Sequence, residues 1–330
     1  MSEERFLVTG GTGCIGSWVV RNLLRESVPV TVLTSGGSRH RLRLILTDEE
    51  LDSITWVHGD VTDIDELEAA GRACGITTIV HLAGLQVPFC AADPLRGGRT
   101  NVLGTLTMFE LARRLGIGRL TYASSAAVYG PADRYAERLL PAEAPFWPTT
   151  HYGVFKVANE LGARVYWETE GIASIGLRPH SVYGPGRDQG MTSKPTLAMI
   201  AASAGRPYRV SFGGRYQFQY VDDVAKTFIR AARAPATGAA VFSLGGPATE
   251  VREIIGTILD VEPGARGGIS CDDRPLALPE AFDGSALEMA LGNQQLTPLR
   301  DGVHQTIDAY RRAIRDGVID EAYLDRALAG

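Results

Sequence analysis

Two side chains that could perform proton chemistry stand four residues apart, at Tyr152 and Lys156. On a helix this spacing places a phenol and an ammonium on the same face. A phenol with a pKa near 10 is a poor base at neutral pH, but a neighbouring ammonium favours the phenolate and lowers that pKa. Because such a pair is common on helix surfaces, a second chemical group is needed to indicate a site.

That second group is Ser125, which follows Ser124 at the end of a predicted strand. Ligands of open α/β sheets bind at the carboxyl ends of the parallel strands. A hydroxyl there can hydrogen-bond a substrate oxygen while Tyr152 moves its proton. The alternative interpretation is an ordinary serine-rich turn between a strand and a loop.

A glycine-rich turn with the sequence VTGGTGCIG spans residues 8–16, directly after the first apolar run. Gly10 allows a tight turn, Gly13 lets the backbone approach a pyrophosphate, and Gly16 lets the following helix pack closely on the strand. The helix amino terminus then presents unpaired N–H groups to the phosphates. In this context the pattern indicates a dinucleotide site, although an ordinary strand-to-helix turn has the same shape.

The elements that must position these groups alternate between short β-branched runs and amphipathic helices. This alternation predicts an α/β fold, a Rossmann-type doubly wound parallel sheet with a smaller C-terminal substrate-binding lobe. We expect the dinucleotide-binding domain in residues 1–182 plus about 221–245, and the substrate lobe in about 183–220 plus 246–330. The expected strands are Phe6–Thr9, Val30–Leu33, Ile54–His58, Thr78–Leu82, Leu120–Ser124, Ala173–Leu177 and one near Val241–Leu244; the expected helices are Ser17–Arg25, Asp63–Ala70, Asn101–Leu115, Tyr152–Glu168, about Val221–Ala234, Glu250–Leu259 and Val303–Arg315.

Composition narrows the class of partner. The 330 residues are 45% hydrophobic and carry a formal charge of -5, so nothing favours capture of nucleic acid or of an anionic membrane. No stretch reaches the apolar length of a membrane span. The cysteines are far apart and lack metal-ligand spacing, so we expect free thiols, no metal site and a cytoplasmic protein that acts on a small, polar molecule.

The adenosine end of the dinucleotide site is ambiguous. An acidic residue closing the second strand would hold the ribose hydroxyls of NAD, but Leu33 is followed by Thr34. Arg39 or Arg41 could instead hold the 2′-phosphate of NADP, or be a solvated surface charge. Either NAD or NADP is therefore expected. Asp60 and Val61, after the third strand, are placed to flank an adenine ring, with a plain turn as the equal alternative.

Taken together, these motifs resemble the extended short-chain dehydrogenase/reductases, also called the NAD-dependent epimerase/dehydratase family. The resemblance covers about the first 230 residues and includes HLAG at 81–84, Asn101, LRP at 177–179, VYGPGR at 182–187 and YVDDVA at 220–225. It implies that Tyr152 is the general base or acid, Ser125 the substrate hydrogen-bonder and Lys156 the cofactor anchor and pKa modifier. In this family the histidine at the place of His81 is usually structural. The cofactor-binding residues implied by motif and resemblance are Gly10, Gly13, Cys14, Ile15, Gly16, Thr34, Arg39, Asp60, Val61, Leu82, Ala83, Gly84, Asn101, Ser124, Tyr152, Lys156, Pro179, Ser181 and Val182.

The resemblance also bears on which of the family's reaction types this chain can catalyse. The dehydratases of this family carry an Asp-Glu pair where this chain has Ala126 and Ala127, so dehydration is set aside. Its UDP-sugar epimerases carry a diphosphate-binding arginine where this chain has Tyr216, with Arg215 one residue earlier. A shift by one residue on a strand turns a side chain to the opposite face.

Two enzymatic interpretations stay open. The first is a dehydrogenase or reductase for a sugar-like or hydroxy-acid substrate, and we prefer it on Ala126, Ala127 and Tyr216. The second is a nucleotide-sugar epimerase that retains its NAD. A non-catalytic NAD(P)-binding scaffold or sensor is disfavoured, because such a protein needs no polarised phenol.

By analogy with the family we expect a homodimer through Asn101–Leu115 and Tyr152–Glu168. The candidate substrate contacts are Gln86, Phe89, Ser125, His180, Ser193, Lys194, Arg215 and Gln217.

Overall fold

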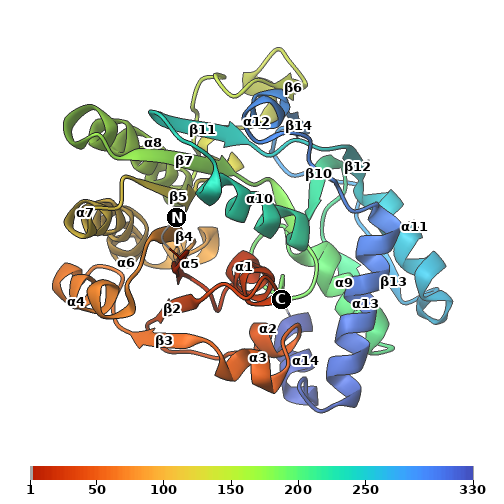
Figure 1. The fold of residues 1–330 in the computed structure, drawn as a ribbon. Coiled ribbons are helices and arrows are strands. Elements are labelled where there is room, and N and C mark those ends of the chain that lie inside the picture. The colour runs from red at the N-terminus through yellow and green to blue at the C-terminus, as the bar shows by residue number, and fades with distance from the viewer. Residues whose placement is uncertain (1–2, 330) are drawn as a thin grey trace.

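The centre of the molecule is a seven-stranded parallel sheet (Figure 1), seen in a computed structural model that describes residues 3–329. The strand order is β11-β7-β5-β4-β1-β2-β3. Because β1 pairs with both β2 and β4, the winding reverses between β1 and β4, which is where ligands of such sheets bind. The predicted Rossmann-type sheet is thus confirmed. Its strands are β1 (Phe6–Thr9), β2 (Val30–Thr34), β3 (Thr55–His58), β4 (Thr78–His81), β5 (Arg119–Ala123), β7 (Ala173–Arg178) and β11 (Ala239–Ser243).

Helices cover both faces of this sheet (Figure 1). On one face lie α4 (Ile64–Cys74), α7 (Gly104–Leu115) and α8 (His151–Glu170), while α1 (Cys14–Arg25) and α10 (Val221–Arg233) pack together on the other. Successive residues of β1 point to opposite faces of the sheet. Phe6 and Val8 pack in the apolar cluster on one face, and Leu7 packs in the cluster on the other. All seven predicted strands and seven predicted helices exist, with ends that differ by up to a few residues.

Two of these end shifts affect the site. Helix α1 begins at Cys14 rather than Ser17, so it starts directly after Gly13 in the glycine-rich turn. The expected helix at Asn101–Leu115 is divided, because residues Arg99–Leu103 form a π-helical turn before α7. Such turns are frequent at functional sites, and this one contains the buried Asn101.

The segment after Arg178 is more regular than its sequence indicates. It contains α9 (Lys194–Ser203), which the sequence did not predict because Pro195 to Ala202 are all buried and show no apolar periodicity. Three small sheets accompany it: β12-β10-β8, β13-β9 and β14-β6. The remaining strands are β6 (Leu139–Leu140), β8 (Ser181–Tyr183), β9 (Tyr208–Val210), β10 (Arg215–Tyr220), β12 (Ala248–Glu250), β13 (Ile269–Cys271) and β14 (Ala281–Phe282). The remaining helices are α2 (His40–Arg43), α3 (Asp48–Asp52), α5 (Val87–Ala92), α6 (Pro94–Gly98), α11 (Val251–Val261), α12 (Ser285–Leu291), α13 (Leu299–Arg315) and α14 (Glu321–Leu328), with short 3-10 turns at Ala126–Val128, Ala132–Arg134 and Pro263–Ala265.

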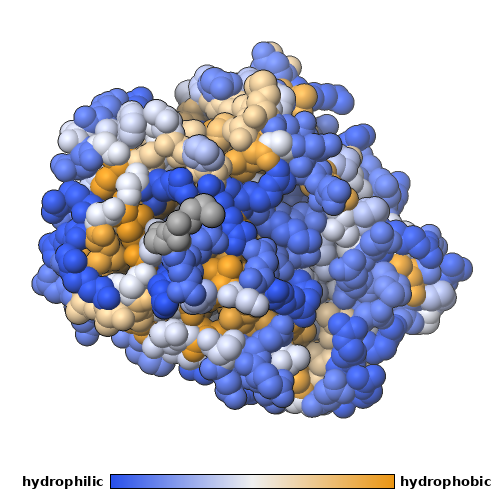
Figure 2. Space-filling model, viewed as in Figure 1, coloured by the Kyte–Doolittle hydropathy of each residue, from blue (hydrophilic) through white to orange (hydrophobic). Residues whose placement is uncertain are grey.

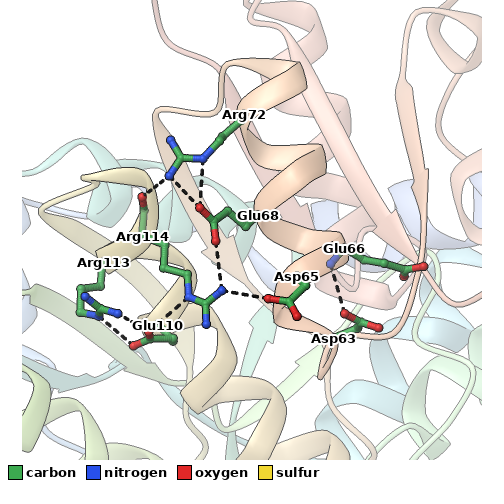
Figure 3. A network of polar contacts seen from close by, with 8 residues as sticks. All are labelled: Asp63, Asp65, Glu66, Glu68, Arg72, Glu110, Arg113 and Arg114. Carbon is green, nitrogen blue, oxygen red and sulfur yellow. Dashed lines mark hydrogen bonds and ion pairs between the residues drawn. The ribbon is translucent and has the colours of Figure 1, made fainter.

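A surface network of ion pairs joins α4 to α7 (Figure 3). Arg114 of α7 reaches Asp65 and Glu68 of α4, each at 3.0 Å, and Glu68 also binds Arg72. The face of the molecule seen in Figure 2 is mostly hydrophilic, with hydrophobic surface in separate areas. Across residues 3–329, no helix has both the length and the apolar character that crossing a bilayer requires.

Candidate active site

The glycine-rich turn forms one wall of a cavity of about 230 Å³ at the carboxyl edge of the sheet. A Cβ added at Gly10, which has a φ of +69°, would lie 2.7 Å from the nitrogen of Ala83, and one at Gly16 would lie 2.1 Å from the carbonyl oxygen of Gly10. Neither position can therefore carry a side chain. No side chain caps the first turn of α1 and no acidic residue lies in it, so its N–H groups suit an anion such as a pyrophosphate.

The end of β4 closes the next part of this wall. The Oγ1 atom of Thr9 accepts hydrogen bonds from the backbone nitrogens of Leu82 and Ala83 and lies 2.7 Å from Nδ1 of His81. The other ring nitrogen of His81 lies 3.0 Å from Oγ1 of Thr105. Burial lowers the pKa of His81 to about 3, so this histidine is a neutral, hydrogen-bonded core residue.

Asn101 organises the loop that follows β4. Its Oδ1 accepts from the nitrogen of Leu85 at 2.8 Å, and its Nδ2 donates to the carbonyl oxygen of Leu85 at 3.0 Å. These contacts hold Gly84 and Gln86 at the cavity wall. Asn101 itself is fully buried and does not line the cavity.

The catalytic candidates meet because α8 closely approaches the 3-10 turn at Ala126–Val128, which follows β5. A Cβ on Gly153 would lie 2.2 Å from the carbonyl oxygen of Ala127, so only glycine permits this contact. Thr150 caps α8 by accepting a hydrogen bond from the nitrogen of Gly153 at 3.1 Å. Tyr152 is consequently presented to Ser125, whose hydroxyl lowers the pKa of the phenol.

Lys156 lies one turn further along α8 and is buried. Its Nζ donates to the carbonyl oxygen of Ala123 at 2.6 Å and lies 5.5 Å from the centroid of the Tyr152 ring. Burial lowers the pKa of Lys156 to about 8, against the charges of Cys90 and Glu160, which raise it. The ammonium form therefore predominates at neutral pH, with little margin.

The pKa of Tyr152 responds to burial and to two neighbouring groups. Burial raises the pKa of this phenol, while the Ser125 hydroxyl and the positive charge of Arg187 lower it. The role expected of Lys156 as a pKa modifier stays a prediction; its ammonium lies 5.5 Å from the centroid of the phenol ring and donates to the end of β5. Arg187 is a further cation that acts on the phenol, and the sequence did not indicate it.

An ion pair lies behind the catalytic helix. Glu160 of α8 and Arg178 of β7 are both buried and approach to 2.6 Å, and Ser124 donates a hydrogen bond to Glu160. Arg178 also donates to the carbonyl oxygen of Ala142 at 2.8 Å. Because a buried pair is costly to break, this contact fixes α8 relative to β7.

The cavity unites most of the site residues expected from sequence. On the cofactor side these are Gly10, Gly13, Cys14, Ile15, Gly16, Leu82, Gly84, Ser124, Lys156, Pro179, Ser181 and Val182, and on the substrate side Gln86, Ser125, Tyr152 and His180. His180 is held by the carbonyl oxygen of Pro279 at 2.9 Å, and burial lowers its pKa to about 4. Phe89 lines an adjoining hollow together with Gly13 and Arg187.

Other expected contacts lie away from this cavity. Arg215 is exposed on β10, and Gln217 is buried with its side chain bonded to the backbone of Gly246 and Phe282. Ser193 is bonded to the carbonyl oxygen of Gly190, and Lys194 begins α9. The geometry therefore does not bring these four residues to Tyr152.

The four candidates for the adenosine end lie at the other end of the sheet edge. Thr34 closes β2 and accepts from the nitrogen of Gly36, and the guanidinium of Arg39 lies 3.8 Å from the centroid of the Trp56 ring. Asp60 accepts from the nitrogen of Thr62, and Val61 packs against Gly104. Arg41, the other cation considered for a 2′-phosphate, is paired with Asp188 at 2.6 Å.

Sequence reasoning missed part of the cavity wall. The segment that includes Leu278, Pro279 and Phe282 closes the substrate side, and it carries no motif that could have indicated this role. Arg187 lies within a motif of the family, but only the fold brings it to the cavity that Gly13 and Tyr152 also line. The other unpredicted wall residues are Val87, Ala123, Ala126, Ala127, Gly190, Met191 and Thr192.

Comparison with known proteins agrees with this geometry. The family described as "NAD dependent epimerase/dehydratase family" matches residues 6–245, which is most of the chain. This chain belongs to that family. It is accordingly an enzyme, and its cofactor is NAD or NADP.

Individual relatives are of several kinds. A UDP-glucose 4-epimerase of Mycolicibacterium smegmatis is 29% identical over 93% of this chain and 98% of its own length. The solved structure of MoeE5 in complex with UDP-glucuronic acid and NAD is 26% identical, with a TM-score of 0.76 over 94% of this chain and 100% of that one. A UDP-glucose 4-epimerase of Thermus thermophilus in complex with NAD shares the fold, with a TM-score of 0.79 at 24% identity over 94% of this chain and 100% of that one.

Proposed function

We propose that this enzyme transfers hydride at a hydroxyl or carbonyl carbon of a small sugar-like or hydroxy-acid substrate, with Tyr152 as the acid/base. One observation carries the proposal: Tyr152, Ser125 and Lys156 line the same cavity as the glycine-rich turn. A reacting carbon placed beside Tyr152 then lies next to the site that suits a dinucleotide.

Each side chain has a distinct task. Ser125 hydrogen-bonds the substrate oxygen and the Tyr152 hydroxyl, which takes the proton during oxidation and returns it during reduction. Lys156 supplies a buried positive charge and ties α8 to the end of β5. Gly13 and Gly16 leave room for the pyrophosphate of NAD or NADP, and Pro179 to Val182 face its nicotinamide end. The dinucleotide, when bound, accepts or donates the hydride.

The walls of the cavity support a substrate without a nucleoside diphosphate. Tyr216 is buried with its hydroxyl at 2.6 Å from the nitrogen of Leu276, and Arg215 faces outward from β10. On the substrate side the cavity is lined by Met191, Leu278 and Phe282. Of the described residues around it, Lys156 and Arg187 are the cations, and Lys156 is turned to Ala123.

A spectrophotometric screen tests this proposal. Sugars, aldonates, uronates and UDP-hexoses are each offered with NAD and with NADP, and the absorbance of the reduced cofactor is followed. Net reduction with an aldonate, a uronate or a free sugar is the expected result. Failure of every substrate to reduce either cofactor, together with conversion of a UDP-hexose, would contradict it.

Epimerisation of a nucleotide sugar is the second candidate. It is favoured by the similarity of the chain to a UDP-glucose 4-epimerase over nearly its whole length. In that case Tyr152 would remove a proton during oxidation and return it after the hydride has gone to the opposite face. Hexose interconversion without any change in absorbance would identify this activity.

The division of the chain into two functional parts and its dimerisation are also proposed. Residues 183–220 and 246–330 form the substrate side of the enzyme, while residues 1–182 and 221–245 bind the dinucleotide; residues 1, 2 and 330 of this division lie outside the described chain. The enzyme is a homodimer through α7 and α8. Val154, Leu161 and Val165 form an exposed apolar stripe on α8, and Leu103 is exposed just before α7.

A further inference from the structure

Arg187 and Gln86 each carry a buried polar side-chain atom without a partner. The Nε of Arg187 and the Oε1 of Gln86 are both shielded from solvent and have no hydrogen-bond partner among the described residues. Both side chains line the cavity that contains Tyr152. Since buried polar groups are nearly always bonded in folded proteins, the N–H donor at Nε of Arg187 suits an acceptor that the chain does not supply.

The two side chains converge over Gly190. This residue has a φ of +101°, and a Cβ added to it would lie 2.5 Å from Oε1 of Gln86 and 3.1 Å from Nη2 of Arg187. Only glycine leaves space for the amide and the guanidinium side by side. The absence of a side chain at Gly190 therefore lets the polar groups of Gln86 and Arg187 lie next to each other on the substrate side of the cavity.

No carboxylate of the described chain neutralises Arg187. The adjacent Asp188 is engaged elsewhere: it accepts from Arg41 at 2.6 Å and from Tyr323 at 2.9 Å and lies 2.7 Å from His40. Among the described residues, the Arg187 side chain donates one hydrogen bond, to Oγ1 of Thr192 at 3.3 Å. A half-buried guanidinium with an open fork is suited to a carboxylate or phosphate, which it binds through two parallel bonds.

We propose that Arg187 and Gln86 form an oxyanion subsite on the substrate side of Tyr152, so that the substrate carries a carboxylate or phosphate close to its reacting hydroxyl. The inference rests on the proposed function and names the substrate class of that site. Arg187 binds the anion through its guanidinium, and Gln86 donates from its amide nitrogen once the amide is turned so that this nitrogen, in place of Oε1, faces Gly190. The walls made by Leu278 and Phe282 exclude water around this contact and strengthen it.

Binding to the NAD-loaded enzyme tests the subsite without reference to turnover. Bound NAD occupies the turn at Gly13, so a further anion must bind elsewhere. Calorimetric titration with malonate, with inorganic phosphate and with neutral malonamide compares the two oxyanions with an uncharged control. We expect wild-type enzyme to bind malonate or phosphate and to bind malonamide at least 10-fold more weakly.

Two variants and one control locate the contact. Arg187→Met is expected to weaken anion binding about 10- to 100-fold while the affinity for NAD changes less than about twofold. Gln86→Glu places a carboxylate beside Arg187 and is expected to compete with the anion to a similar extent. Arg266→Met removes an exposed surface cation and leaves anion affinity unchanged. The melting temperature of each variant shows that it is folded.

Three outcomes would overturn the subsite. The first is that wild-type enzyme binds none of the anions, and the second is that all variants bind them equally well, which is the behaviour of adventitious sites. Alternatively, Arg187→Met weakens NAD binding and leaves anion affinity intact, which assigns Arg187 to the phosphates of the dinucleotide. Failure of the proposed function is separate: it appears as absence of NAD binding or of hydride transfer, whatever the anions do.

Discussion

The Nζ of Lys156 lies 5.5 Å from the centroid of the Tyr152 ring and donates to the carbonyl oxygen of Ala123, so one side chain links the catalytic phenol to the end of β5. The i to i+4 spacing places both on one face of α8. Burial lowers the pKa of Lys156 to about 8 and raises that of Tyr152. The protonation of the two groups therefore sets the pH range of the reaction.

Activity in the reductive direction should fall above about pH 8. Tyr152 then acts as a proton donor, and its raised pKa keeps it protonated, whereas Lys156 loses its proton near pH 8. Measurement of kcat/KM for carbonyl reduction against pH should give a level region near neutral pH and an alkaline limb. Lys156→Arg keeps the charge at alkaline pH, so its limb should move upward by at least a unit. An identical limb in the variant would show that another group titrates.

Acid should destabilise the fold partly through His81. The pKa of His81 is about 3 in the folded protein and about 6.5 when unfolded, so between these values the unfolded chain binds the extra proton. The free energy of unfolding should fall as the pH drops from 6.5 towards 3, by about 1.4 kcal/mol per pH unit from this residue. Urea unfolding of wild type and of His81→Gln, which cannot take up the proton, measures the difference. Equal slopes would place the acid sensitivity elsewhere.

Arg39 should contribute to the choice of cofactor. It lies over Trp56 beyond the end of β2, whereas Arg41 is neutralised by Asp188. A 2′-phosphate near β2 would meet Arg39, so Arg39→Ala should weaken NADP binding about 10-fold and leave NAD binding nearly unchanged. Fluorescence titration with both cofactors provides the measurement. An equal loss for both would show that Arg39 supports the fold of the loop rather than the 2′-phosphate.

A charge on the exposed stripe of α8 should dissociate the proposed dimer. Val165 is 52% exposed and Val154 is 50% exposed on the same side of the helix. Val165→Glu would bury a charge in each half of a symmetric contact, which costs several kcal/mol. Light scattering should show a dimer for wild type and a monomer for the variant. A wild-type monomer at all concentrations would refute this assembly.

The sequence predicted the parts of the fold that depend on local patterns. Strands such as Val30–Leu33 and helices such as Asp63–Ala70 can be recognised from the spacing of their apolar residues. The glycines at 10, 13 and 16 indicate the turn in the same way. The cavity therefore gathers the predicted Ser125, Tyr152 and Lys156 beside that turn.

What could not be predicted depends on contacts between distant segments. Helix α9 is buried on all sides and shows no amphipathic period, so its sequence resembles a loop with apolar residues. Pro279 reaches the cavity because the neighbouring strand β14 pairs with β6, which lies far earlier in the sequence. Arg215 looked suitable by residue type, yet it lies exposed on β10, and the cations that line the cavity are Lys156 and Arg187.

The most direct test is the hydride-transfer rate of Tyr152→Phe with NAD bound. The phenylalanine ring keeps the shape of the site and removes the proton relay, so turnover with the best substrate of the screen should fall about 100- to 10,000-fold. The affinity for NAD, measured by titration, should stay within about twofold of wild type. A variant that transfers hydride at the wild-type rate while binding NAD normally would contradict the assignment of Tyr152 as the acid/base.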